Sequence, residues 1–370
     1  MCTKNKYMIS SCQERKCGIE LLRIVAMIAI VSGHMIIHGN FESIPLTVNG
    51  CISIALTQGS RIAVNCFVLI TGYFLNDNTI PFKKIGKVHR QIFLYSLSIF
   101  LAMLLVGETR LSIESVISVL FPVITSQYWF ATTYLMLLLV SPILNYCIAN
   151  ISRRLHLEFI AIFFVLWSIC PTLIMGSPCF SNFGWFVWLY LLAAFIRKYP
   201  LNFFDRVRLI HGALLYTSIV AAAVLTFALG YHVGFLRENA KYLFAELNRV
   251  PAVLCSTIVF IASLNLNLPN NKYIINIASG TFGVYLIHDT PLIRKLLWYK
   301  IFNASQHLKS PLFALYAILY ICTVFFVGIL IDTMRRAVDF QVYGFINRKC
   351  PLEKILSKGI LRRFLHLFHD

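Results

Sequence analysis

Charged side chains are scarce in this chain: they make up 13% of its 370 residues, and only 15 residues are acidic. Hydrophobic residues make up 58% of the chain. A soluble domain needs a largely polar surface, and this composition cannot supply one. We therefore interpret the chain as a polytopic membrane protein.

Several familiar chemical motifs are also missing. The 11 cysteines include no C-x-x-C pair with a matching second pair, which argues against a disulfide framework or a cysteine metal site. No Gly-x-Ser-x-Gly elbow indicates a serine nucleophile. His34 and His38 are an i,i+4 pair, but no Glu completes a His-Glu-x-x-His motif, so we expect no metal.

Ten apolar runs are present, and each is a candidate for one membrane crossing. The predicted fold is all-α: a polytopic membrane helix bundle of about ten transmembrane helices. The predicted organisation is a cytosolic N-terminal segment (1–17), a transmembrane domain (18–333) and a cytosolic basic tail with an amphipathic helix (334–370). The ten runs are 19–38, 52–75, 92–107, 128–149, 158–175, 183–196, 209–230, 250–264, 276–293 and 311–331.

The distribution of basic residues predicts the orientation of these helices. The net charge is +18, and the basic residues separate the apolar runs. If the N-terminus is inside, Lys and Arg are about threefold more numerous in inner than in outer segments, which favours an N-in, C-in topology. We expect these basic segments to contact anionic lipids and no nucleic acid.

Two ionisable side chains stand out in the first apolar run, which also contains Glu20 and His38. Arg23 lies near its start and His34 near its far end. Eleven residues at about 100° each amount to three turns plus about 20°, so both side chains lie on one face, roughly 16 Å apart along the axis. Such residues are costly in hydrocarbon and indicate function. The alternative is that Arg23 snorkels and His34 bonds a neighbouring helix.

The predicted topology places further ionisable residues at the depth of His34. Arg61, Arg249, His288 and Asp289 all fall in the outer half of the membrane. Isolated charges would be expensive there, so we predict a shared polar cavity, although each residue could also line the interface separately. A histidine in such a cavity can serve as a general base.

A basic cluster between the second and third runs forms a second candidate site. It consists of Lys83, Lys84, Lys87 and Arg90 and lies on the predicted inner side. One interpretation is a positive-inside anchor. The other is a clamp for the phosphates of a cytosolic anionic cofactor.

Four segments together resemble the acyltransferase-3 family of integral membrane O-acyltransferases, and the resemblance spans nearly the whole chain. The sequence has Lys87-x-x-Arg90 where the family has Arg-x-x-Arg, and Thr71 in place of a serine. The four segments are Arg23-x10-His34, Val64–Leu75, Tyr128–Tyr134 with Ser141-Pro142 and Asn145, and Phe282–His288.

The resemblance implies transfer of an acyl group, commonly acetyl, from a cytosolic acyl-CoA to a sugar hydroxyl of a cell-surface or lipid-linked glycan. It implies a multi-pass protein of a bacterial inner or plasma membrane, with acetyl-CoA as donor co-substrate. The family's His-Arg pair corresponds to His34 and Arg23. We expect Lys87, Arg90 and Arg23 to hold the CoA phosphates, and His34 to deprotonate the acceptor or relay the acyl group. On the acceptor side we expect Trp129, Tyr128, Tyr285 and His288.

Two other functions remain open from the residues alone. A lipid-linked oligosaccharide flippase would need a continuous polar path and paired internal repeats, and we detect neither in the sequence. A glycan repeat-unit polymerase would be expected to carry a large outer loop, whereas the predicted outer loops here are short.

Overall fold

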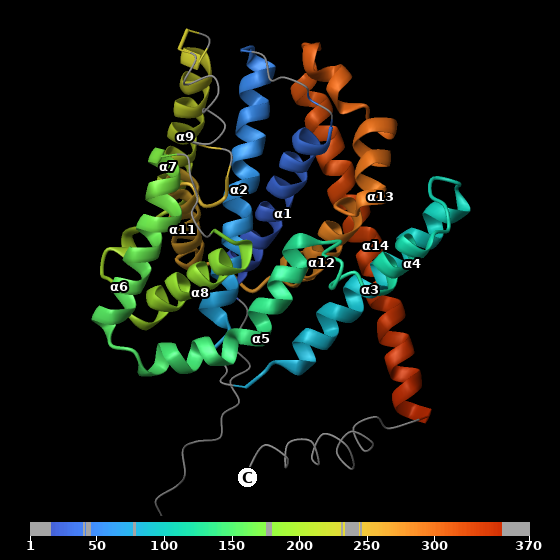
Figure 1. Cartoon of the computed structure of the whole chain (residues 1–370), viewed down its shortest axis with the longest axis horizontal. Helices are drawn as coiled ribbons and strands as arrows, with labels where there is room; N and C mark the ends of the chain where they lie inside the picture. Colours follow the sequence, from blue (N-terminus) through green and yellow to red (C-terminus); the bar gives the residue numbers. More distant parts are fainter. Residues whose placement is uncertain are drawn as a thin grey trace, which may run out of the picture.

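The computed structural model describes residues 16–39, 41, 46–76, 79–174, 180–230, 232–233, 244 and 246–349. Within these ranges the chain is helical and contains no strand. The helices form one bundle in which most run side by side (Figure 1). This arrangement confirms the prediction of an all-α, polytopic helical fold.

Each of the ten predicted apolar runs coincides with helix. The π-helical turn Val165–Ile169 joins α6 and α7 into one continuous rod. The helices in these runs are α1 (Cys17–His38), α2 (Val48–Phe74), α3 (Phe82–Leu105), α5 (Trp129–Asn150), α6 (Arg153–Phe164) with α7 (Cys170–Ile174), α8 (Asn182–Lys198), α9 (Leu209–Gly230), α11 (Val250–Leu264), α12 (Lys272–His288) and α14 (Phe313–Lys349).

Seven helical segments of the described chain are long and apolar enough to cross a membrane: α1, α2, α3, α5, α6–α7, α9 and the first 27 residues of α14. The other three, α8, α11 and α12, have 17, 15 and 17 residues. At about 1.5 Å per residue they are shorter than the hydrocarbon core of roughly 30 Å. The number of ten crossings and the N-in, C-in orientation stay predictions.

Polar residues fix where several of these helices begin. The side chains of Thr47, Ser152, Ser181 and Asn271 accept hydrogen bonds from backbone N–H groups two or three residues further on. Such N-caps satisfy donors that have no partner within the helix. They begin α2, α6, α8 and α12 within a few residues of the predicted boundaries.

Helix α1 lies in the middle of the bundle and contacts α2, α11, α12 and α14. At Gly33 there is no room for a Cβ atom, because Ser60 of α2 occupies that space. Gly72 of α2 likewise packs against the backbone of Tyr190 in α8. The contact between Gly33 and Ser60 brings the next residues, His34 of α1 and Arg61 of α2, to the same level of the bundle.

The segment after α12 differs from its prediction. The run was predicted to continue to residue 293, but α12 ends at His288 and Asp289 caps it. Pro291 then begins the short helix α13 (Pro291–Arg294), followed by a π-helical segment (Lys295–Ile301) and a 3-10 segment (Ala304–Lys309). This turn carries Arg294 back toward the end of α12.

The remaining predictions concern the ends of the chain. Helix α1 runs upward and α14 runs downward in Figure 1, as an even number of crossings requires. Helix α14 continues without a break past the predicted domain boundary at residue 333. Most of the N-terminal segment and the amphipathic helix of the tail lie outside the described residues. The amphipathic stretch 111–124 contains the short helix α4 (Ile113–Leu120).

Candidate active site

The fold brings together two histidines that lie 254 residues apart in sequence. The Nδ1 atom of His34 lies 3.0 Å from the Nε2 atom of His288. His288 is completely buried, whereas His34 retains some access to two cavities described below. Two of the ionisable residues that were predicted to share a cavity, His34 and His288, are therefore in contact.

The hydrogen bonds of this pair determine which nitrogen of each ring carries the proton. His288 Nδ1 lies 2.6 Å from the Val284 carbonyl oxygen, which can only accept, so His288 Nδ1 must donate. In neutral His288 the Nε2 atom is then an acceptor, and His34 Nδ1 donates to it. The remaining nitrogen of His34, Nε2, keeps its lone pair. This assignment makes His34 Nε2 the basic atom of the pair.

A buried carboxylate supports the two histidines. Asp289 Oδ1 lies 3.3 Å from His34 Nδ1 and 3.6 Å from His38 Nε2. Arg294 Nε donates to the same oxygen at 2.8 Å. Asp289 therefore faces the edge of His34 that already carries a proton. A second proton, taken up at Nε2, would make an imidazolium that this carboxylate stabilises.

Two residues around the pair, Arg294 and His38, were not predicted as site residues. Arg294 directly follows the apolar run that was predicted to end at residue 293, and no role was predicted for it. His38 was considered as the i,i+4 partner of His34 in a metal motif, and its ring packs edge-on against His34 with the ring centroids 5.1 Å apart. The available signals were the i,i+4 spacing of His38 from His34 and the position of Asp289 directly after His288.

A cavity of about 390 Å³ leads from His34 toward the predicted inner side. We term this cavity the inner pocket. Its polar and charged lining includes Arg23, Lys84 and Lys87, and His34 lies at its other end. Its apolar walls include Met27, Ile30, Val64, Phe67, Ile70, Phe74, Val88, Trp129, Phe130 and Phe282. The inner pocket thus combines a cationic mouth with an apolar interior.

A second cavity of about 330 Å³, the outer pocket, lies on the other side of His34. Its lining is much more polar and includes His38, Ser60, Arg61, Asn182, Glu246, Asp289 and Arg294. Four residues line both cavities: Ile30, His34, Val64 and Trp129. His34 therefore stands where the inner and outer pockets meet.

The predicted acceptor-side residues take different positions around this junction. Trp129 lines both pockets, and Tyr285 lines the inner one. His288 lines neither and contacts His34 instead. Tyr128 is fully buried, and its hydroxyl is 2.8 Å from the Thr290 hydroxyl oxygen. Tyr128 and His288 thus contact other residues and line neither pocket, whereas Trp129 and Tyr285 line a pocket.

The predicted donor-side residues also separate. Arg23 lines the inner pocket and donates from Nη1 to Glu20 Oε1 at 2.7 Å, a pairing that the sequence analysis missed. Lys87 lines the inner pocket as well. Arg90 does not line it; its Nη2 atom lies 3.5 Å from Asp339 Oδ2 of α14. Lys84 of the same basic cluster also lines the inner pocket.

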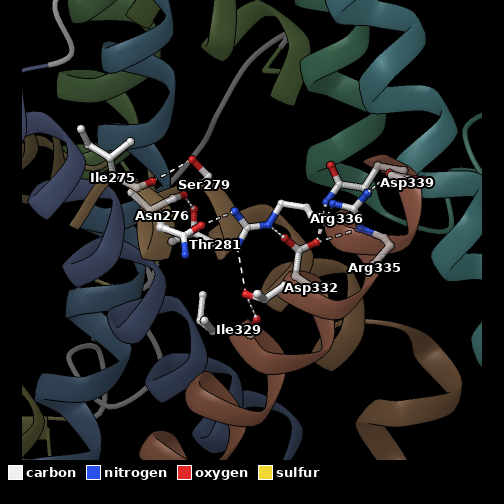
Figure 2. A network of polar contacts seen from close by, with 12 residues as sticks. Ile275, Asn276, Ser279, Thr281, Ile329, Asp332, Arg335, Arg336 and Asp339 are labelled. Carbon is white, nitrogen blue, oxygen red and sulfur yellow. Dashed lines mark hydrogen bonds and ion pairs between the residues drawn. The ribbon is translucent and has the colours of Figure 1, made fainter. Parts of the chain in front are cut away.

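A charged network holds the wall of the inner pocket. Asp332 of α14 is fully buried and accepts hydrogen bonds from Gln91 and Tyr95 of α3 at 3.2 and 2.8 Å. Arg335 and Arg336 flank it, with nitrogen–oxygen distances of 2.8 and 3.0 Å (Figure 2). Arg336 also donates to the Asn276 side chain of α12. The network ties α3, α12 and α14 together, and Gln91 itself lines the inner pocket.

Three ligand atoms of the cluster are also close enough to hold a metal ion. Single atoms of His34, His38 and Asp289 lie within 4.8 Å of one another. However, Arg294 already supplies a positive charge to Asp289, and His34 Nδ1 is used by His288. Our expectation of no metal stays a prediction.

The fold and this geometry define a polytopic membrane protein with a histidine–aspartate cluster between two pockets. A family model for an acyltransferase domain matches residues 18–332, nearly the whole chain. The chain belongs to this acyltransferase-3 family and is a membrane acyltransferase. The flippase and polymerase alternatives are therefore set aside. No curated protein and no solved structure matches the chain.

Proposed function

We propose that this acyltransferase moves an acetyl group from cytosolic acetyl-CoA to a sugar hydroxyl of a cell-surface or lipid-linked glycan, with His34 as general base. The observation that carries the proposal is the position of His34, which lines both pockets. A group-transfer enzyme needs its donor and acceptor to meet at one reactive atom, and a residue shared by two cavities meets this need.

The inner pocket is the proposed donor site. Arg23, Lys84 and Lys87 supply cations for the CoA phosphates, and the apolar interior accepts the uncharged acyl end. The approximately 16 Å of helix between Arg23 and His34 separates the phosphate contacts from the reacting centre. Arg90 contributes to the same cationic surface from outside the pocket.

The reaction follows from the proton assignment above. His34 Nε2 takes the proton of the sugar hydroxyl while the oxygen attacks the thioester carbonyl carbon. The carbon–sulfur bond then breaks, and the CoA sulfur leaves as thiolate and receives that proton. Asp289 and His288 hold the imidazole and stabilise its charged form at 3.3 and 3.0 Å.

The proposed topology connects the two substrates. With the N-terminus inside, the inner pocket faces the cytosol, where acetyl-CoA is made, and the outer pocket faces the opposite leaflet. A bacterial inner or plasma membrane is the proposed location, and its anionic lipids would contact the basic inner segments.

Transfer of label tests this proposal. Detergent-purified protein is incubated with acetyl-labelled CoA and an extracted surface glycan, and label in the glycan is counted. We expect transfer by wild type and by the exposed-histidine control His232→Gln, but not by His34→Gln. Absence of label in the glycan with every acyl-CoA tried would contradict the donor and acceptor proposed here.

A further inference from the structure

The outer pocket contains a positive charge that no acid neutralises directly. Its two arginines are Arg61 and Arg294, and its two acids are Glu246 and Asp289. Arg294 is bonded to Asp289 at 2.8 Å. Arg61 has no hydrogen bond or ion pair among the described residues, and its Nε atom is buried without a partner.

A second unpaired arginine interacts electrostatically with Glu246 of this pocket. Arg249 is 3% exposed, and its Nε and Nη1 atoms have no hydrogen-bond partner in the described part of the chain. Glu246 acts electrostatically on both Arg61 and Arg249, but it is exposed and bonds neither. Two guanidinium groups therefore share one solvated carboxylate. A buried charge without a partner is costly, so the pocket favours an anionic occupant.

Packing holds Arg61 close to His34. Gly33 and Ser60, the residues just before His34 and Arg61, pack so tightly that Ser60 occupies the space of a Cβ atom on Gly33. One turn further along α2, Asn65 donates to the Leu247 carbonyl at 2.7 Å and so anchors the loop that carries Glu246. An anion at Arg61 would therefore occupy the cavity that His34 lines.

We propose that the outer pocket binds the acceptor through an anionic group, and that Arg61 is the residue that selects it. The acceptor class is then an acidic sugar with a carboxylate, or a sugar that bears a phosphate ester. A guanidinium fork matches both oxyanions in a bidentate manner. This inference rests on the proposed function and specifies its acceptor.

Binding of small probes tests the site without catalysis. The thermal midpoint of the detergent-purified protein is measured with glucuronic acid, glucose 1-phosphate and glucose. Stabilisation by one or both anions, but not by glucose, supports the site and identifies carboxylate or phosphate as the preferred group. Arg61→Gln should abolish the shift, and Arg110→Gln, which changes an exposed arginine outside both pockets, should keep it. Equal stabilisation by glucose, or an unchanged shift in Arg61→Gln, overturns the inference.

Glu246→Gln provides a test of opposite sign. It removes the carboxylate that competes for Arg61 and Arg249, so the Kd of the stabilising anion should fall severalfold. This test does not depend on the Arg61 variant, which could lose binding simply because it misfolds. A gain in affinity requires a folded protein. Weaker anion binding in Glu246→Gln would contradict the inference.

A transfer assay separates this inference from the proposed function. A glucuronate-containing oligosaccharide is compared with its carboxyl-reduced form. Arg61→Gln should lower kcat/KM for the acidic acceptor tenfold or more, with the KM for acetyl-CoA unchanged. Equal use of both acceptors by wild type refutes the anion site and leaves the function standing. Anion binding that depends on Arg61, without transfer to any glycan, supports the site and refutes the function.

Discussion

At the scale of single residues, His34 is the residue on which the proposed chemistry depends most. Its Nδ1 atom contacts His288 and Asp289, which leaves Nε2 as the proposed base at the junction of the two pockets. Glutamine keeps the size and polarity of histidine but takes up no proton at neutral pH. The substitution therefore tests proton transfer and not packing.

We expect His34→Gln to insert and fold normally and to lose about 10²–10⁴-fold in the rate of acetyl transfer. His38→Gln should be milder, since His38 lies 3.6 Å from Asp289 and carries no part of the proton path. Purified variants are compared by initial rates at saturating acetyl-CoA. Wild-type rates in His34→Gln would require the base assignment to be abandoned.

Asp289→Asn addresses the supporting carboxylate. It keeps the shape of the side chain and removes the charge that stabilises the His34 imidazolium, so kcat should fall by at least tenfold. The KM for acetyl-CoA should not change, because Asp289 does not line the inner pocket. If Asp289 had a purely structural role, Asp289→Asn would instead lower the thermal midpoint of unfolding and leave kcat of the folded fraction unchanged.

Lys87 and Arg90 differ in the structure although they are neighbours in the sequence. Lys87 lines the inner pocket, whereas Arg90 lies outside it and reaches Asp339. Lys87→Ala should weaken acetyl-CoA binding about 10- to 150-fold, which corresponds to the loss of one charge-assisted contact worth ~1.5–3 kcal/mol. Arg90→Ala should weaken it less. Titration of labelled CoA against both variants measures their Kd values. Equal Kd values in wild type and Lys87→Ala would indicate that the basic cluster is only a membrane anchor.

At the scale of helices, the Asp332 network determines how α3, α12 and α14 fit together. The fully buried Asp332 carboxylate accepts hydrogen bonds from Gln91 and Tyr95. It also forms ion pairs with Arg335 and Arg336, which lie on either side of it in Figure 2. Breaking a buried ion pair leaves charges without a partner and costs several kcal/mol.

Asp332→Asn should therefore destabilise the protein by about 3–5 kcal/mol and raise the Kd for acetyl-CoA, because Gln91 lies in the pocket wall. Thermal unfolding in detergent and a CoA titration measure the two effects. Asp205→Asn, a change in an exposed inner segment, is the matched control. An Asp332→Asn protein as stable as wild type would show that the network does not hold the helices.

At the scale of the whole molecule, the orientation of the bundle decides which pocket meets which substrate. Ten crossings from an inner N-terminus place residue 150 inside and residue 237 outside. Reporter fusions after Asn150 and after Arg237 should therefore report opposite sides, the first inside. The same side for both would mean that α8, the shortest of the three helical segments between these two positions, does not cross the membrane.

The sequence by itself determined the helices and the residues worth testing. Apolar runs and helical periodicity are local properties, so they located ten helices and placed Arg23 and His34 on one face of α1. The topology then put His34 and His288 at one depth. The resemblance of four segments indicated the family that the domain match confirms.

Only the tertiary structure decided which of these residues meet. His34 and His288 are 254 residues apart, and the sequence carries no signal for the orientation of two imidazoles across such a distance. It also gave no reason for α12 to end at His288, which lets Arg294 turn back onto Asp289. The two pockets, the turn of Arg90 toward Asp339 and the unpaired Arg61 likewise arise from packing between helices. Helix formation is governed by neighbours in the chain, whereas a site in a bundle is governed by neighbours in space.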